Sequence, residues 1–287
     1  MLNQKEQWEL RKFASEIRLE TLKEFKHLGF GHVGGSMSIV EILAVLYGGQ
    51  LKHDPTELDW EDRDRLILSK GHAGPALYAA LALRGFFPHD LLKTLNQPGT
   101  SLPSHCDRNK TPGVDATTGS LGQGLSCGVG ITLGGRLDKK DYYTYVILGD
   151  GELNEGQNWE AAMFASHYNL SRLIAIIDCN GKQLDGTTEE ILDLKDIALK
   201  FKAFGWNTID VNDGHDVSKI WCAIDKAKQS TKKPTAIIIH TVKGKGCTYS
   251  EFLCMNHHQF ITPEEADEAV AAAQGVLDDL LREEVCE

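Results

Sequence analysis

The sequence lacks the features that mark membrane, secreted and general nucleic-acid-binding proteins. No stretch approaches the roughly 20 consecutive apolar residues that a membrane-spanning helix needs. The N-terminal segment MLNQKEQWELRKF has neither the apolar core nor the small-residue cleavage site of a signal peptide. Basic side chains are in the minority, with 30 Lys and Arg against 41 Asp and Glu and a net charge of −11. That balance is unlike the basic footprint of a general nucleic-acid binder.

Paired cysteine spacing is also absent. The chain has seven cysteines, an odd number, and no CxxC motif. This pattern favours free thiols in a reducing compartment over a disulfide framework or a zinc site. We therefore expect a cytoplasmic protein, and we interpret Cys179, at the end of an apolar run, as an inert buried thiol. The seven positions are Cys106, Cys127, Cys179, Cys222, Cys247, Cys254 and Cys286.

Short apolar runs alternate with helical patterns along most of the chain. Apolar runs without polar interruption, separated by helices, are typical of parallel strands buried on both faces. Repeated strand–helix alternation predicts an α/β fold with a doubly wound, mainly parallel sheet flanked by helices. The predicted strands cover residues 66–68, 142–148, 172–178, 207–211 and 234–242.

No internal repeat, low-complexity run or linker divides the chain. We expect one domain over residues 1–262 and an appended helix over 263–287, which begins with the capping box of Thr262 and Glu265. Helices are also predicted over 7–24 and over 39–49, the second capped by Ser36 or Ser38. The glycine-rich segment 120–137 predicts a helix that packs very closely on a neighbour, and the long loop 102–120 is expected to be functional.

Two oxygen-bearing side chains follow neighbouring predicted strands. Asp150 lies in the tight turn Gly-Asp-Gly after the strand 142–148, and Asn180 follows the strand 172–178. Ligands of open parallel sheets bind outside the carboxyl ends of the strands, so the two side chains are expected to share a site. Carboxylate and amide oxygens suit Mg²⁺ shared with a diphosphate. The alternative is that the first motif is only a turn and Asn180 only a helix cap.

Five segments together carry a resemblance to a known family. They are residues 31–47 (GHVGGSMSIVEILAVLY), 64–85 (DRLILSKGHAGPALYAALALRG), 104–130, 149–186 and 241–246 (TVKGKG). In this order and spacing they resemble the N-terminal section of transketolase, a thiamine-diphosphate-dependent enzyme, over roughly residues 7–263. The resemblance implies the thiamine-diphosphate-binding fold, with residues 1–262 as its diphosphate-binding domain.

The resemblance also implies a cofactor site. Asp150, Asn180 and the carbonyl of Lys182 match the ligands of Mg²⁺ or of another divalent cation such as Ca²⁺ or Mn²⁺. Glu155 resembles an acid of the subunit-interface hydrogen-bond network. The residues that match cofactor-binding positions are His72, Gly119, Leu121, Gly151, Asn180, Leu184 and His257.

Four histidines match those that line the transketolase active-site channel: His32, His72, His105 and His257. Imidazole suits ketol transfer because it both gives and takes protons near neutral pH. His257 is adjacent to His258, and we favour the first of the two. Five further histidines match no motif and are interpreted as ordinary: His27, His53, His89, His167 and His215.

The chain is about half as long as a complete transketolase. After the segment 241–246 only one helix is predicted, which leaves no room for the second α/β domain that binds the aminopyrimidine and carries the glutamate that assists ylide formation. The resemblance therefore implies the N-terminal subunit of a split transketolase, which pairs with a separate partner chain in a heterotetramer of two copies of each. It implies transfer of a two-carbon ketol unit between sugar phosphates, and leaves the sugars open.

Three other functions compete with this one. The first is the alpha subunit of a 2-oxoacid dehydrogenase, against which the histidine set argues. The second is deoxyxylulose-phosphate synthase, which is a single chain. The third is a non-catalytic regulatory subunit, which would not need Asp150 and Asn180. A dinucleotide site is excluded because Gly122, Gly124 and Gly128 do not form GxGxxG.

Overall fold

A five-stranded parallel sheet organises the molecule. The computed structural model describes residues 2–284. The strands are β2 (Arg65–Leu68), β3 (Thr144–Gly149), β4 (Leu173–Cys179), β5 (Asn207–Val211) and β6 (Thr235–His240). Their order is β2-β3-β4-β6-β5, and every neighbouring pair is parallel. The prediction of a doubly wound parallel sheet is confirmed.

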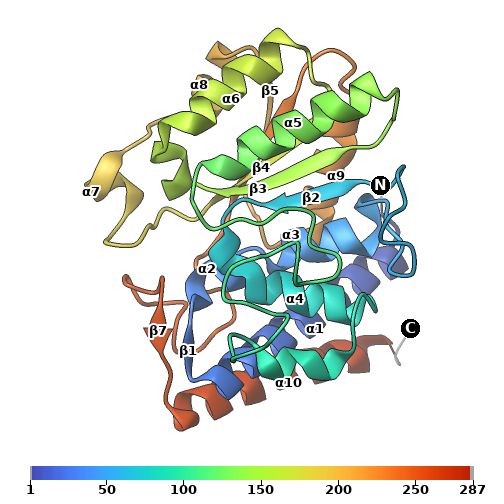
Figure 1. The fold of residues 1–287 in the computed structure, drawn as a ribbon. Helices are drawn as coiled ribbons and strands as arrows, with labels where there is room; N and C mark the ends of the chain where they lie inside the picture. Colours follow the sequence, from blue (N-terminus) through green and yellow to red (C-terminus); the bar gives the residue numbers. More distant parts are fainter. Residues whose placement is uncertain (1, 285–287) are drawn as a thin grey trace.

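Helices cover both faces of the sheet (Figure 1), and alternate residues of the central strands face two different hydrophobic cores. On one face, Tyr145, Ile147, Ile174 and Ile176 pack with α3 (Val40–Val45), α4 (Gly74–Leu83) and α9 (Val217–Lys228). On the other, Val146, Leu148, Ala175 and Ile177 pack with α5 (Gln123–Leu137), α6 (Gly156–His167) and α8 (Ile197–Ala203). Burial on both faces explains why the strands are continuously apolar. The short helix α7 (Thr188–Leu192) buries none of its residues.

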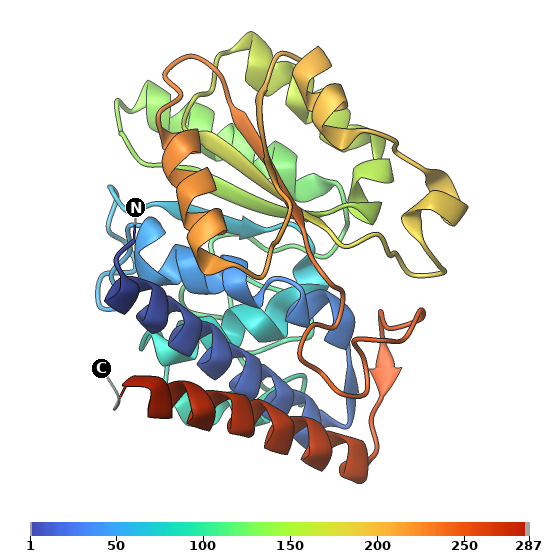
Figure 2. The ribbon, with the colours of Figure 1, turned by 180° about the vertical axis from the view of Figure 1, so that it is seen from behind.

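A third cluster joins the two ends of the chain. Helix α1 (Gln4–Leu28) packs with one side on α4, and its Leu19, Leu22 and Phe25 meet Ala269 and Ala273 of α10 (Pro263–Glu284). The two helices lie side by side (Figure 2). The capping box of α10 forms as predicted, since the Thr262 hydroxyl accepts from the Glu265 amide at 3.2 Å and Glu265 Oε2 accepts from the Thr262 amide at 2.9 Å. A domain division at residue 263 stays a prediction, and residues 285–287, with Cys286, lie outside the described residues.

A two-residue antiparallel pair ties the end of α1 to the segment before α10. Strand β1 (Phe30–Gly31) pairs with β7 (Gln259–Phe260), with Phe30 opposite Phe260. This pair brings the chain that follows β1 next to the chain that precedes β7. Among residues 2–284, no helix combines the length and the hydropathy needed to cross a bilayer.

The helix predicted over 39–49 differs from the structure. Residues Val33–Met37 form α2, α3 ends at Val45, and the chain continues through a wide helical turn, Leu46–Gln50. Neither Ser36 nor Ser38 caps α3; the Ser38 hydroxyl donates instead to Asp178 Oδ2 at 2.7 Å. The segment is buried on all sides, so no polar face marks where it breaks.

Candidate active site

Four adjacent strands end at one edge of the sheet, and each delivers a functional side chain there. Lys70 and His72 follow β2, Asp150 follows β3, Asn180 follows β4, and Lys243 follows β6. These five residues line one cavity of about 160 Å³. The expectation that Asp150 and Asn180 lie together is met, at the edge where parallel sheets bind ligands.

Asp150 is a buried carboxylate without a cation. Its side chain is 3% exposed; Oδ1 accepts from the Gly151 amide at 2.8 Å and Oδ2 from the Gly181 amide at 2.6 Å. Within residues 2–284 no Lys, Arg or His lies within ion-pair distance of it. Burial, and then the negative charge of Asp178, raise the pKa of Asp150 to about 6. A cation placed in the cavity would restore the charged form.

Asn180 and Lys182 present further oxygens beside Asp150. Asn180 Nδ2 donates to Asp178 Oδ2 at 3.0 Å, and its Oδ1 accepts from the Lys182 amide at 3.1 Å. The Lys182 carbonyl accepts from Lys243 Nζ at 3.2 Å. One carboxylate, one amide oxygen and one carbonyl are a hard-cation donor set that needs more oxygens from a ligand. Within residues 2–284 no group of three His, Cys, Asp or Glu side chains forms a self-sufficient metal site.

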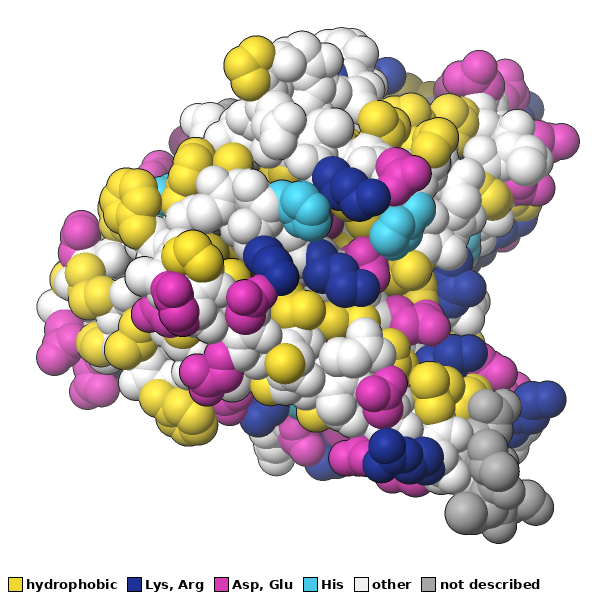
Figure 3. Space-filling model, turned by 90° about the horizontal axis from the view of Figure 1, so that it is seen from below, with side chains coloured by type: hydrophobic (Ala, Val, Ile, Leu, Met, Phe, Trp, Pro, Cys, Tyr) yellow, Lys and Arg dark blue, Asp and Glu magenta, His cyan; other side chains and the backbone are white. Residues whose placement is uncertain are grey.

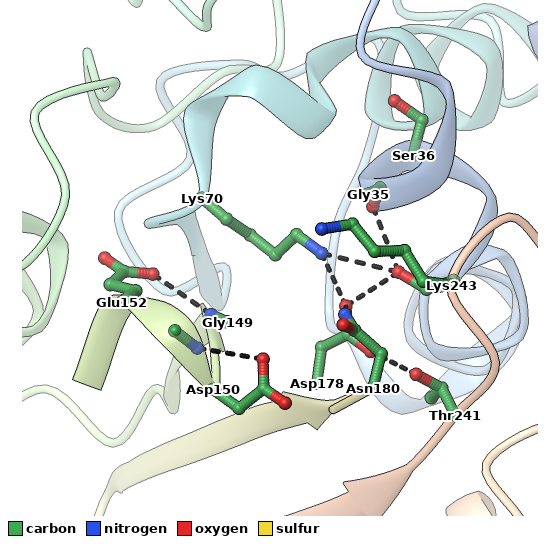
Figure 4. Close-up of polar contacts among 12 residues, drawn as sticks. Gly35, Ser36, Lys70, Gly149, Asp150, Glu152, Asp178, Asn180, Thr241 and Lys243 are labelled. Carbon is green, nitrogen blue, oxygen red and sulfur yellow. Dashed lines mark hydrogen bonds and ion pairs between the residues drawn. The ribbon is translucent and has the colours of Figure 1, made fainter. Parts of the chain in front are cut away.

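Sequence analysis missed three buried charges beside these oxygens (Figure 4). Lys70 Nζ pairs with Asp178 Oδ2 at 2.5 Å, and Asp178 also accepts from Thr241. Burial favours the neutral acid, but the Lys70 ammonium outweighs it and the pKa of Asp178 lies below its ordinary value. Lys243 is 4% exposed, and burial, with Lys70 nearby, lowers its pKa to about 8. Both lysines lie in the segments SKGH and TVKGKG, so the signal was in motifs that carry the family resemblance.

Glu152 fixes the loops around the cavity. Its Oε1 accepts from the Gly122 amide at 2.9 Å and from the Ser69 hydroxyl, and Oε2 accepts from the Gly149 amide at 3.1 Å. These three partners lie after β2, before α5 and at the end of β3. One buried carboxylate therefore sets the relative positions of three segments that contribute to the site.

The histidines predicted for the channel form one cluster around His32. Its ring centroid lies 5.4 Å from those of His72 and His105 and 5.2 Å from that of His257. His258 also contacts His32, at 4.9 Å, but His257 lines the cavity and His258 does not. The pairing of β1 with β7 creates this cluster, because it joins His32 to residues 257 and 258.

Burial keeps these imidazoles neutral near pH 7. It lowers the pKa of His32 to about 4 and that of His257 to about 3, and holds the pKa of His72 well below its ordinary value. The pKa of His105 is lowered by the same cause. A neutral imidazole offers one donor and one acceptor, which is what a hydroxyl-bearing substrate requires.

The remaining predicted residues lie around the same opening. Leu121, Gly151 and Leu184 line the cavity. Gly119 has φ +146°, and a Cβ there would come within 3.1 Å of the His105 ring, so the close approach requires glycine. Glu155 lies outside the cavity, exposed, at the start of α6. Its interface role, like the ligand roles of the other residues, stays a prediction.

None of the residues interpreted as ordinary lines the cavity. Burial raises the pKa of the Cys179 thiol to about 12, as expected of an inert thiol. His27 and His53 bond only to nearby carbonyls, of Lys23 and Leu51. His215, in contrast, bridges two segments of the chain.

Comparison with known proteins identifies the family. Residues 10–274 match the family model described as "Transketolase, thiamine diphosphate binding domain". The 6-deoxy-6-sulfo-D-fructose transketolase subunit SqwG of Clostridium sp. (strain MSTE9) is 51% identical over 266 residues, which cover 93% of this chain and 96% of that protein. An apulose-4-phosphate transketolase subunit of Phocaeicola vulgatus is 39% identical over 255 residues, 88% of this chain and 89% of that protein.

Solved structures agree with this result. A transketolase of Pichia stipitis in complex with sedoheptulose 7-phosphate superposes with a TM-score of 0.84 at 31% identity. The match covers 96% of this chain but 46% of the yeast chain, so this chain spans less than half of that transketolase and almost all of the subunit relatives. From its sequence, its fold and the residues gathered at the carboxyl edge of its sheet, the chain belongs to the transketolase family, as a thiamine diphosphate binding domain of the N-terminal type.

Proposed function

We propose that this chain is the N-terminal subunit of a two-chain transketolase, which transfers a two-carbon ketol unit from a ketose donor to an aldose acceptor. The match in length to the transketolase subunits, against less than half of a single-chain transketolase, supports the division into two chains. The observation that carries the proposal is the buried Asp150, without a cation partner among residues 2–284, facing Asn180 across the cavity.

The residues present fit a divalent cation and a diphosphate. Asp150, Asn180 Oδ1 and the Lys182 carbonyl would hold Mg²⁺, Ca²⁺ or Mn²⁺. The Gly151 amide and the ammonium groups of Lys70 and Lys243 would face the diphosphate. When bound, thiamine diphosphate supplies the carbanion chemistry of ketol transfer. The chain's own contribution is to neutralise the diphosphate, orient the cofactor and exclude water.

The histidine cluster supports ketol transfer over the alternatives. His32, His72, His105 and His257 present neutral rings to the space beside the cavity, where they would exchange protons with sugar hydroxyls. The alpha chain of a dehydrogenase that acts on 2-oxoacids has no such hydroxyls to serve. A regulatory subunit would have no use for an intact set of donors and buried charges.

A partner subunit would complete the site from the open side. Exposed apolar residues lie in the two segments that contribute Leu184 and His257 to the cavity lining: Leu184, Ile191 and Leu192 in one, and Phe252, Leu253, Met255 and Phe260 in the other. Figure 3 shows hydrophobic side chains interspersed with acidic ones along the left of the molecule, the side on which Figure 1 places α7 and β7. We assign this surface to a C-terminal transketolase subunit that carries the pyrimidine-binding domain and the ylide-assisting glutamate.

Two copies of this chain would meet in the assembled enzyme, in a cytoplasmic heterotetramer. Glu155 is the N-cap of α6, and Met163, Phe164 and Tyr168, at or just after the other end of α6, are exposed. An exposed apolar group on the helix that Glu155 caps is what a self-association surface requires. The names of the relatives suggest the donors to assay first, 6-deoxy-6-sulfofructose and apulose 4-phosphate, beside common ketose phosphates.

The test is titration of the full chain with thiamine diphosphate, with and without Mg²⁺. We expect Asp150→Ala to lower the Mg²⁺-dependent affinity by more than about 100-fold, because it removes the single carboxylate of the donor set. Circular dichroism should show an unchanged fold. An affinity equal to that of the wild type would remove Asp150 from the site, and ketol transfer by the mixture of both subunits tests the activity itself.

A further inference from the structure

The loop that carries Lys243 is held on both sides of that residue by one partly buried network. Arg18 of α1 pairs with Glu41 of α3 at 2.7 Å, and Glu41 Oε2 lies 3.0 Å from His215 Nδ1. His215 Nε2 accepts from the Val242 amide at 2.9 Å, and Arg18 Nε donates to the Lys245 carbonyl at 3.0 Å. Val242, directly before Lys243, and Lys245, two residues after it, are thus held by the same network.

The hydrogen bonds fix the protonation of His215. The Val242 amide is a donor, so Nε2 is the acceptor and carries no proton. Nδ1 then carries the proton of the neutral ring and donates it to Glu41. Burial alone would raise the pKa of Glu41, but Arg18 and then His215 outweigh it and the pKa lies below its ordinary value. Glu41 is therefore an anion that orients the ring, much as a carboxylate orients a metal-binding histidine.

The position of Lys243 depends on this loop because its side chain makes one hydrogen bond among the described residues, and its backbone carbonyl accepts from Asn256 Nδ2 at 2.9 Å. Its ammonium donates to a neutral carbonyl, that of Lys182, and its stem runs over Gly34, where an added Cβ would come within 2.9 Å of Lys243 Cγ. The Gly34 carbonyl accepts from the Gly244 amide at 3.0 Å, and Thr241 donates to Asp178. Val242 itself is 40% exposed, and its amide has His215 as its hydrogen-bond partner.

We propose that His215 is a positioning residue: its neutral ring, oriented by Glu41, holds the Val242 amide and so directs the buried Lys243 ammonium at the diphosphate end of the cofactor site. His215 does not touch that site itself. The identity of the ligand in this inference rests on the proposed function. The positions of His215, Val242 and Lys243 rest on the hydrogen bonds alone.

Two substitutions separate the two bonds of the ring. His215→Gln places an acceptor near the position of Nε2 and retains the bond to Val242. His215→Asn places a donor near Nδ1 and retains the bond to Glu41, but loses Val242. We expect thiamine diphosphate with Mg²⁺ to bind His215→Gln within about threefold of the wild type, and His215→Asn and His215→Ala about tenfold more weakly.

A double-mutant cycle tests whether the effect passes through Lys243. In a Lys243→Met background, His215→Ala should lower the affinity by no further factor, because the group that it positions is absent. A general structural role for His215 would lower the affinity in both backgrounds. Equal losses in the two backgrounds, or equal affinities of the Gln and Asn variants, would overturn the proposal.

A ligand-free measurement separates this proposal from the proposed function. The rate at which acetic anhydride modifies Lys243, followed by peptide mass spectrometry, should be slow in the wild type and His215→Gln and several-fold faster in His215→Asn and His215→Ala. The same rate in all four proteins would overturn the positioning role. Failure of the wild type to bind thiamine diphosphate would instead contradict the proposed function, while the order of labelling rates still decides the geometry.

Discussion

At the scale of single residues, the site is an arrangement of charges and neutral rings with different tasks. His72 lines the cavity beside Asp150, whereas His105 contacts His32 and the Gly119 backbone and lies outside the cavity lining. The two histidines are both buried enough to be neutral, so their difference is one of position. Position therefore predicts which step each substitution affects.

We expect His105→Ala to bind thiamine diphosphate normally but to turn over ketose phosphates at least about tenfold more slowly, a loss typical of removing one proton-transferring group. His72→Ala should weaken cofactor binding and turnover together. Steady-state kinetics with the partner subunit, on a donor such as xylulose 5-phosphate, and a separate cofactor titration measure the two effects. Turnover by His105→Ala at the wild-type rate would show that this loop does not face the substrate.

Glu24 is a buried acid that the chemistry does not use. It is 1% exposed, and neither carboxylate oxygen has a hydrogen-bond partner among the described residues. Burial, and then Glu20, raise its pKa well above the ordinary value, so the folded protein keeps a proton that the unfolded chain releases. Stability from this group is present below the ordinary carboxyl pKa and is lost as pH rises toward the raised value.

We expect Glu24→Met to stabilise the protein by about 1–3 kcal/mol, the usual cost of an unsatisfied buried polar group. The gain should be larger at pH 8 than at pH 5. Urea unfolding at the two pH values measures it, with Glu9→Met, at an exposed position of the same helix, as the control. A gain that does not change with pH would mean that Glu24 does not titrate with folding.

At the scale of elements, the glycine-rich helix α5 shows what a sequence pattern predicts well. Its prediction as a closely packed helix is confirmed, because an added Cβ at Gly128 would lie 2.5 Å from Val146 Cγ2 of β3. Gly130, on the same helix, has no atom within 4 Å of such a Cβ. The two glycines differ in the space beside them: Gly128 packs against β3, and Gly130 has open space around the position of a Cβ.

Gly128→Ala should therefore destabilise the protein by about 1–3 kcal/mol, since the helix must move off the sheet. Gly130→Ala should stabilise it by up to about 1 kcal/mol, because alanine is the better helix former. Denaturant unfolding of both variants measures the difference. Equal effects of the two substitutions would contradict the packing of α5 described above.

The sequence predicted the strands, their parallel direction and the proximity of Asp150 to Asn180. Continuous apolar runs mark buried parallel strands, and ligand-binding residues follow the carboxyl ends of such strands. Three features could not. The pairing of β1 with β7 involves two residues on each side, too few for a periodic signal. A lysine such as Lys70 or Lys243 looks the same in sequence whether it is buried or solvated. The role of His215 depends on Val242 and Glu41, which are distant from it in sequence.

At the scale of the whole molecule, the proposed function assigns one end of the cofactor to this chain and the other end to its partner. We expect this chain alone to be folded and monomeric or dimeric, and inactive in ketol transfer. With its partner subunit it should form a stable assembly of two copies of each chain, through interfaces that bury on the order of 2,000 Å² or more. Size-exclusion chromatography with light scattering, beside a ketol-transfer assay, measures both. Robust transfer by this chain alone would contradict the division of the active site between two chains.

The packing of α10 on α1 has a consequence for biosynthesis. The apolar side of α1 that holds Leu19, Leu22 and Phe25 leaves the ribosome long before its cover, α10, is synthesised. At about 5–20 residues per second, tens of seconds separate the two. Throughout that interval the nascent chain displays an unprotected amphipathic helix, a feature that chaperones bind. His257 is synthesised just before α10, so the histidine cluster is also assembled only after this interval.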